Sequence, residues 1–346
     1  MRKLEPDVFL AQQATGLVWD VRSPVEYAAG HLPGAVSVPL FSDEERAQVG
    51  ICYKQKGGPQ AVELGLEMVG PKMASWVRQA RQTIGTGGSI GLYCWRGGMR
   101  SGSMAWLLEQ AGFDVSLVLG GYKAYRHYVR AVLERPWRLH VLGGHTGSGK
   151  TELLHHLAEA GAQVIDLEGL ARHKGSAFGA IGQPEGQPRI EHFENLLAGQ
   201  LLTKDASKPI WVEDESQTIG QVFIYKPFYD LMEAAPLYCL QVPLTDRVAR
   251  LVADYAQGPE ADLAAAIQKI ARRMGPQHAQ TALAALKVGE YAHVAELALA
   301  YYDPCYDHAL ARRPNPPVAF VPYLKGQEIP TAKALLAEEQ LNQTAP

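Results

Sequence analysis

Residues 139–151, with the sequence LHVLGGHTGSGKT, constrain the fold more than any other stretch of the chain. The apolar run LHVLGG ends in a loop that fits the pattern G-x-x-x-x-G-K-[ST], and the following KTELLHHLAEAG has helical periodicity. Such a loop holds an anion when a buried strand leads into it and a helix begins at it, because loop amides and the helix N-terminus then face the same point. The stretch therefore predicts a strand, a phosphate-binding loop and a helix within a parallel α/β sheet.

Within this loop, each residue type has a chemical reason. Gly144, Gly147 and Gly149 allow the backbone to wrap around a phosphate, and Lys150 supplies a positive charge to a diphosphate. Thr151 carries the hydroxyl that ligates Mg²⁺ in loops of this pattern. The competing interpretation is an ordinary glycine turn, which would not need the lysine.

A P-loop also needs an acidic partner, and two strands offer one. Asp214 ends the strand-like PIWVEDES, and Asp166 ends QVIDLE. We favour Asp214, although either carboxylate could simply cap the end of its strand.

The second chemical feature is the stretch LYCWRGGMRSG at 92–102. Cys94 ends an apolar strand and precedes a helix, so its loop should wrap into the positive end of that helix. Two glycines permit an anion-binding turn, and Arg96 and Arg100 add positive charge. This setting favours a reactive thiolate over a buried structural cysteine.

The chain is long enough for two domains, with 346 residues of which 47% are hydrophobic and 20% charged. Strands alternate with helices on both sides of ERPWRLH (134–140), which predicts an α/β fold with two parallel sheets. We place a first domain at 8–134 and a second at 135–340, the latter ending in an Ala-rich helical part from residue 246.

Composition also excludes several classes of protein. The formal net charge of −3 argues against indiscriminate nucleic-acid binding. The four cysteines lie far apart, so neither a zinc site nor a disulfide framework is predicted. We find no apolar run long enough for a membrane helix and no signal-peptide core behind the N-terminus, so we expect a cytoplasmic protein.

The first domain resembles the rhodanese fold. The resemblance lies in DVRSPVEYAAGHLPGAVSVP (20–39) and YCWRGGMRSGSMAWLLEQAGFDVSLVLGGYKAY (93–125). It implies that a sheet covered by helices on both faces carries Cys94 in a chalcogen-transfer role. Many sulfurtransferases of this fold place the arginine five residues after the cysteine, whereas Arg100 lies six after Cys94. That spacing is similar to the Cys-x5-Arg loops of phosphatases on the same fold and indicates a cradle of phosphate size.

A rhodanese domain followed by a P-loop domain resembles the bacterial tRNA 2-selenouridine synthase family over nearly the whole chain. Four further stretches carry the resemblance, namely 43–65, 167–182, 189–197 and 211–220. It implies a transferase that replaces sulfur by selenium in the wobble 2-thiouridine of tRNA, with selenophosphate and geranyl diphosphate as co-substrates and an S-geranylated intermediate. Cys94 would carry the selenium, an enzyme that makes selenophosphate could be a partner, and Mg²⁺ could assist the P-loop.

The residues fit this chemistry in their own right. Sulfide leaves a carbon centre poorly, whereas an alkylated sulfur leaves as a thiolate. The apolar AFGAIG (177–182) could contact a prenyl tail or form a mobile lid. The candidates for contact with RNA phosphates, each of which could equally be an ordinary surface charge, are Lys54, Lys56, Arg172, His173 and Lys174.

Two other functional classes remain open from the sequence. One is a Cys-x5-Arg phosphatase or kinase-like enzyme acting on a small phosphate ester, although no acid is evident for the phosphatase version. The other is a nucleotide-sensing regulator with an inert rhodanese module, against which the retained Cys94 argues, since a binding module needs no thiol there.

Overall fold

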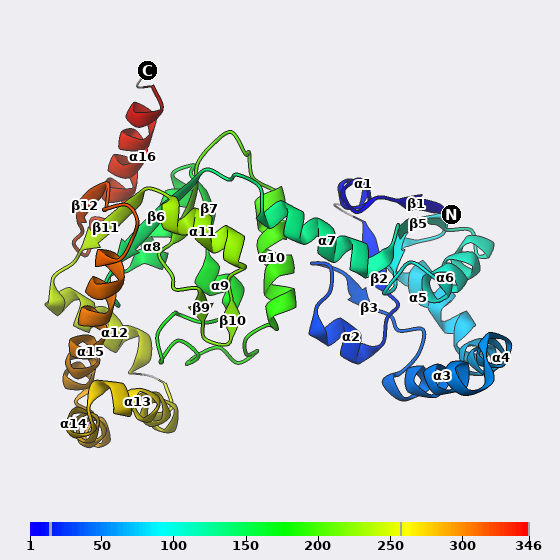
Figure 1. Ribbon diagram of the computed structural model, residues 1–346, viewed down its shortest axis with the longest axis horizontal. Helices are drawn as coiled ribbons and strands as arrows, with labels where there is room; N and C mark the ends of the chain where they lie inside the picture. Colours follow the sequence, from blue (N-terminus) through cyan, green and yellow to red (C-terminus); the bar gives the residue numbers. More distant parts are fainter. Residues whose placement is uncertain (14–15, 257, 345–346) are drawn as a thin grey trace. The chain divides into compact units, whose positions relative to one another are not determined.

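The computed structural model describes residues 1–13, 16–256 and 258–344 (Figure 1). The chain forms two compact units. The N-terminal unit comprises Met1–Val132 together with Glu194–Gly199, and the C-terminal unit comprises Leu133–Phe193 and Gln200–Pro346. The change of unit after Val132 lies close to the predicted boundary at 134/135. The short segment Glu194–Gly199 was not anticipated, because a contact between residues so far apart in the chain leaves no local sequence pattern.

The sheet of the N-terminal unit is parallel throughout, in the order β1-β5-β4-β2-β3. Its strands are β1 (Arg2–Leu4), β2 (Leu17–Asp20), β3 (Val36–Ser37), β4 (Ser89–Tyr93) and β5 (Asp114–Val118). Strand β4 is in the middle of the order, and its Ile90 and Leu92 are fully buried. A central strand covered on both faces needs apolar side chains in both directions, which explains the continuous apolar run in the sequence.

The helices of this unit follow local sequence signals. Helix α3 begins with a capping box, in which the Ser42 and Glu45 side chains each accept from the other's backbone N–H. Gly57, with φ of +95°, then separates α3 from α4. The helices are α1 (Pro6–Gln12), α2 (Pro24–Ala29), α3 (Asp43–Lys56), α4 (Gly58–Val69), the 3₁₀ turn η1 (Gly70–Lys72), α5 (Met73–Ile84), α6 (Met99–Gln110) and α7 (Gly121–Leu133).

The C-terminal unit has a second parallel sheet, in the order β12-β11-β6-β8-β7. Its strands are β6 (Leu139–Gly144), β7 (Gln163–Ile165), β8 (Ile210–Glu213), β11 (Leu237–Gln241) and β12 (Ala319–Pro322). A separate antiparallel pair joins β9 (Thr218–Ile219) to β10 (Val222–Phe223). Strand β6, which leads into the P-loop, is in the middle of the sheet.

Helices of the C-terminal unit fall into two groups (Figure 1). Helices α8 and α16 pack against each other, and α8 also contacts the strands β6, β7 and β8. Helices α12 to α15 enclose a second apolar core that includes Leu263, Ile267, Leu286 and Ala298. The helices are α8 (Lys150–Glu159), α9 (Leu167–Ala171), α10 (Ile190–Leu202), α11 (Lys226–Ala234), α12 (Leu244–Tyr255), α13 (Glu260–Met274), α14 (Pro276–Lys287), α15 (Tyr291–Ala311) and α16 (Glu328–Thr344).

The predicted α/β fold class is confirmed, and each predicted chemical loop follows the central strand of its own sheet. Ligands in parallel α/β sheets bind at the carboxyl ends of the strands, so both loops occupy the expected edge. The edge strands β1, β3 and β12 were missed, because short edge strands have little apolar pattern. None of the described helices has the length and apolar character needed to span a bilayer.

Candidate active sites

Cys94 lies directly after β4, where that strand turns toward α6. Its side chain is only 3% exposed, and the Ser101 hydroxyl donates a hydrogen bond to Sγ at 3.1 Å. Ser101 is fully buried in the first turn of α6. The sulfur is therefore held near the positive end of a helix by a side chain of that helix.

Two positions, one in this loop and one in the segment packed behind it, require glycine. Gly97 adopts φ of +64°, and a Cβ on Gly121 would lie 2.4 Å from the carbonyl oxygen of Cys94. The Tyr122 N–H donates to that same carbonyl at 2.8 Å. The Gly-Gly-Tyr segment at residues 120–122 thus packs against the cysteine loop and supports it.

The two predicted arginines of this loop have different surroundings. Arg100 pairs with Glu26, with Nη1 at 2.7 Å from Oε2, and Arg46 approaches the same carboxylate at 3.1 Å. Burial alone would raise the pKa of Glu26, but the hydrogen bond and charge of Arg100, together with the Ser23 N–H and the charge of Arg46, outweigh burial and lower that pKa. Arg96 is exposed on the loop. It is therefore the better placed of the two to meet an incoming anion, while Arg100 positions the start of α6.

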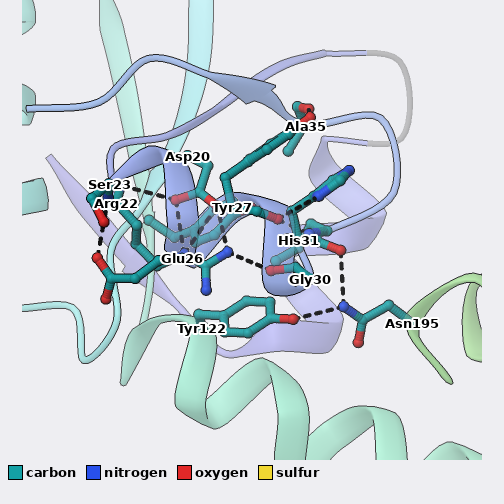
Figure 2. A network of polar contacts seen from close by, with 12 residues as sticks. Asp20, Arg22, Ser23, Glu26, Tyr27, Gly30, His31, Ala35, Tyr122 and Asn195 are labelled. Atoms are coloured by element: carbon teal, nitrogen blue, oxygen red, sulfur yellow. Dashed lines mark hydrogen bonds and ion pairs between the residues drawn. The ribbon is translucent and has the colours of Figure 1, made fainter. Parts of the chain in front are cut away.

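The Asp-x-Arg motif near the N-terminus forms a buried ion pair (Figure 2). Asp20 and Arg22 are 0% and 1% exposed, and Nη2 of Arg22 also donates to the carbonyl of Gly30 at 2.6 Å. The guanidinium lies 3.7 Å from the centre of the Tyr122 ring. The motif therefore connects the turn at residues 30–34 to the segment at residues 120–122, which supports the cysteine loop.

Asn195 extends this network and was not predicted. Its amide donates to the carbonyl of His31 at 2.9 Å and to the Tyr122 hydroxyl at 2.8 Å (Figure 2). The neighbouring Glu194 pairs with Arg126. The signal available in the sequence was a Glu-Asn pair between the apolar Phe193 and Leu196 of this helix, since buried polar groups need partners.

We expect Asp20→Asn to destabilise the N-terminal unit strongly, because it leaves the buried Arg22 charge uncompensated. Breaking a buried pair from one side costs about 3–5 kcal/mol. Chemical denaturation followed by fluorescence measures the change. The matched control is Asp114→Asn, which removes an exposed pair with Arg2 and should cost less than about 1 kcal/mol. Equal effects of the two variants would contradict the structural role of the motif.

The P-loop of the second unit has the conformation its sequence predicts. Gly147 and Gly149 adopt φ of +77° and +78°, and α8 begins at Lys150. The Lys150 ammonium reaches back to donate to the Gly144 carbonyl at 2.9 Å. The hydroxyl of Thr151 lies inside the same site. The five predicted P-loop residues are therefore brought together around one anion-sized space.

This loop opens onto a cavity of about 1300 Å³. Arg250, on α12, donates to the Gly147 carbonyl at 3.2 Å and lies 3.0 Å from Glu152. Lys174 and Arg313 also line the cavity. Arg250 was missed by sequence reasoning, because an arginine in an amphipathic helix is indistinguishable from a surface charge until the helix is placed over the loop.

The acidic candidates lie around the same cavity with different partners. Asp214 accepts from Arg313 at 2.6 Å and from the Tyr306 hydroxyl at 3.0 Å. Asp166 caps α9 by accepting from the Gly169 N–H at 2.6 Å. Glu168, which was not predicted, accepts from the Thr151 hydroxyl at 2.9 Å. Across the described parts of the chain, no group of three or more His, Cys, Asp and Glu side chains is placed to hold a metal ion.

Two further glutamates near the P-loop have raised pKa values. Burial and the neighbouring Glu168 raise the pKa of Glu215 well above its ordinary value. Burial, followed by Asp166 and Glu168, does the same to the pKa of Glu213. Glu213 is fully buried and accepts from the Leu167 N–H at 2.9 Å, which fixes the start of α9.

We expect the raised pKa of Glu213 to make the C-terminal unit less stable as pH rises. The unfolded carboxyl loses its proton near 4.5, while the folded one retains it, so the stabilisation is present below that pH and is lost above it. Glu213→Gln should flatten the fall in stability as pH rises above about 4.5. Thermal melting at a series of pH values tests this expectation, with the exposed Glu185→Gln as the control variant. If the melting temperatures of wild type and Glu213→Gln changed with pH in parallel, the expectation would be wrong.

The predicted RNA contacts lie in unlike environments. Lys54 and Lys56 are exposed in the last turn of α3. Arg172 is partly exposed and lies 3.0 Å from Glu185. His173 is 3% exposed, and burial together with Lys269 lowers its pKa. Lys174 faces the P-loop cavity, with its ammonium 5.3 Å from the ring centre of Tyr255.

The presence of both loops agrees with the families whose sequences this chain matches. Residues 137–322 match the family model described as the tRNA 2-selenouridine synthase AAA domain, and residues 5–128 match the rhodanese-like domain. Three curated relatives are each named tRNA 2-selenouridine synthase. The one from Aeromonas salmonicida is 36% identical over 85% of this chain and 87% of its own, and the one from Marinobacter nauticus is 36% identical over 85% and 88%. The one from Cupriavidus necator is 43% identical over 71% and 67%.

The family match covers the unit that contains Lys150, and the rhodanese match covers the unit that contains Cys94. The predicted combination of domains is thereby confirmed. The chain belongs to the tRNA 2-selenouridine synthase family and is an enzyme of that type.

Proposed function

We propose that this enzyme replaces sulfur by selenium at C2 of wobble 2-thiouridine in tRNA, using geranyl diphosphate and then selenophosphate. One observation carries the proposal. The chain has two different anion-binding loops, each at the carboxyl end of the central strand of its own parallel sheet. One presents a thiol at Cys94, and the other presents the Lys150 ammonium. Two such loops suit two successive half-reactions on one base.

The first half-reaction belongs to the P-loop. The thiocarbonyl sulfur attacks C1 of geranyl diphosphate, a C–S bond forms, and the C–O bond breaks with its electron pair leaving on diphosphate. Negative charge grows on the leaving oxygens in the transition state. Lys150 and Arg250, both on the P-loop cavity, are placed to compensate it.

The second half-reaction belongs to the cysteine loop. The Cys94 thiolate attacks the phosphorus of selenophosphate, so that an S–P bond forms, the P–Se bond breaks and selenide is released into the cradle formed by the loop amides and Arg96. The selenide adds to C2 of the S-geranylated base, and the sulfur departs as geranyl thiolate with the electron pair of the broken C–S bond. Water then cleaves the S–P bond, which releases phosphate and returns the Cys94 thiol. The deeper arginine, Arg100, holds the loop by its bond to Glu26.

The residues of the P-loop fit a magnesium ion, because the Thr151 hydroxyl and the Glu168 carboxylate lie together as hard oxygen donors. Asp214 is the alternative carboxylate, once released from Arg313. Bound there, Mg²⁺ would offset charge on the diphosphate oxygens.

The tRNA backbone requires positive charge outside the two cavities. Exposed Lys54, Lys56 and Arg172 suit RNA phosphates, whereas Lys174 suits the ligand of the P-loop. Selenophosphate must come from an enzyme that makes it, and both that supply and the tRNA substrate support a cytoplasmic location.

Reconstitution tests the proposal. Purified protein is incubated with tRNA that contains 2-thiouridine, with geranyl diphosphate, selenophosphate or both, and nucleosides are analysed by mass spectrometry. We expect S-geranyl-2-thiouridine with the diphosphate alone and 2-selenouridine with both. Unchanged 2-thiouridine under every condition, in a folded protein that binds this tRNA, would overturn the proposal; release of phosphate from small esters instead would favour the phosphatase alternative.

A further inference from the structure

The P-loop cavity continues into a small apolar recess between α12, α13, α14 and α15. The recess has a volume of about 40 Å³. Thr146 of the P-loop, Leu251 and Tyr302 line both the cavity and the recess, so the two are contiguous at the phosphate-binding loop itself. A ligand whose phosphates lie on the loop therefore has an apolar space directly beside it.

The lining of the recess is hydrocarbon with a few hydroxyls at its edge. Phe178, Leu263, Val294 and Ala298 form much of its wall. Among the described residues that line it there is no carboxylate, carboxamide or cationic side chain. The Tyr302 hydroxyl already accepts from the Ala177 N–H at 2.9 Å. A purine base would lose its hydrogen bonds to water here without gaining replacements, whereas an alkenyl chain gains by leaving water.

The loop that contains Phe178 contributes to the lining of this recess. The Phe178 ring lies 6.0 Å from that of Tyr255 on α12, and the Lys174 ammonium lies over the same tyrosine. One short segment thus contributes both a cation to the polar cavity and an aromatic ring to the apolar recess. The positively charged cavity and the apolar recess therefore lie next to each other, as the diphosphate and the hydrocarbon tail do in a prenyl diphosphate.

The geometry points to the recess as the binding site for the end of the ligand's prenyl tail, so that the residues around the recess set the length of tail that the P-loop cavity accepts. This inference rests on the proposed function and adds to it where the tail lies and which residues set its length. The narrow volume holds only a few carbon atoms, so the rest of the tail lies along Leu251, Tyr255 and Tyr302.

Calorimetric titration of the full chain in Mg²⁺ buffer tests the assignment with inorganic pyrophosphate, dimethylallyl diphosphate, geranyl diphosphate and ATP. We expect geranyl diphosphate to bind at least about tenfold more tightly than pyrophosphate, because each buried methylene favours binding. Dimethylallyl diphosphate, which is one isoprene unit shorter, should fall between them. Equal affinity for pyrophosphate and geranyl diphosphate, or tighter binding of ATP, would overturn the assignment.

Two variants locate the tail. Ala298→Leu fills the recess and should remove the advantage of geranyl diphosphate while changing pyrophosphate affinity less than about twofold. Ala285→Leu is the matched control, because Ala285 lies in the same apolar core, is similarly buried and does not line the recess. Val294→Ala enlarges the recess and should improve binding of farnesyl diphosphate relative to geranyl diphosphate, which keeps the test decisive if Ala298→Leu does not fold.

The failure of this inference and that of the proposed function can be told apart. If Ala298→Leu geranylates tRNA with an unchanged KM for geranyl diphosphate, the tail lies elsewhere and the proposed function stands. If folded wild-type protein that binds both tRNA and the diphosphate transfers no geranyl group, the proposed function fails whatever the recess holds.

Discussion

Cys94→Ala will lose selenium transfer by at least about 10³-fold, because removal of a reacting nucleophile leaves only binding and positioning. The same variant should still convert 2-thiouridine to its S-geranyl form when given geranyl diphosphate, since alkylation consumes no thiol. With both co-substrates present, the S-geranyl nucleoside should therefore accumulate. Mass spectrometry of digested tRNA measures both products.

Cys239→Ala is the matched control for this prediction. Cys239 is as buried as Cys94, at 3% exposure, but lies within β11 and contacts the Tyr306 hydroxyl. Its replacement removes the same buried sulfur without touching the cysteine loop, so any general effect of packing appears in both variants. Normal selenouridine formation by folded Cys94→Ala would refute the role of Cys94 as the nucleophile.

Lys150→Ala will lose geranylation by about 10²–10³-fold, the usual effect of removing one charge-stabilising donor from a transition state. The ammonium donates to the Gly144 carbonyl of its own loop, so the free energy of unfolding should change little. Lys226→Ala, which breaks an exposed pair with Asp230, controls for loss of a lysine from the same unit. Rates of S-geranyl nucleoside formation decide the outcome.

Supplying tRNA that is already S-geranylated separates the two loops. Lys150→Ala should then form selenouridine from selenophosphate at the wild-type rate, whereas Cys94→Ala should not. If Lys150→Ala geranylates 2-thiouridine as fast as wild type, the P-loop serves RNA or nucleotide binding and prenyl transfer occurs elsewhere in the chain.

The two loops could be recognised from the sequence because their chemistry is local. An apolar strand, a glycine turn and a helix start follow one another within a few residues, so Cys94 and Lys150 appear with their contexts intact. The partners of these residues could not be recognised in the same way. Glu168 reaches Thr151 only because β7, which leads to Glu168, and β6, which leads to the P-loop, both pair with β8. Arg250 reaches the P-loop only because α12 packs beside it.

The roles of the other motif residues also needed the structure. From the sequence, His173 and Lys174 are adjacent basic residues of one type, yet one is buried and the other faces the phosphate cavity. The Asp-x-Arg motif marks the fold family, but only the buried contact of Arg22 with Gly30 and Tyr122 shows that it supports the cysteine loop.

The fold class, the order of the two domains and the positions of the cysteine loop and the P-loop follow from the sequence, because periodicity, glycine turns and helix starts act between near neighbours along the chain. The tertiary structure alone decided which distant groups complete each site. Asn195 reaches Tyr122, and Ala298 comes to line a recess beside Thr146, because folding buries apolar surface and obliges each buried polar group to find a partner wherever the packed chain supplies one.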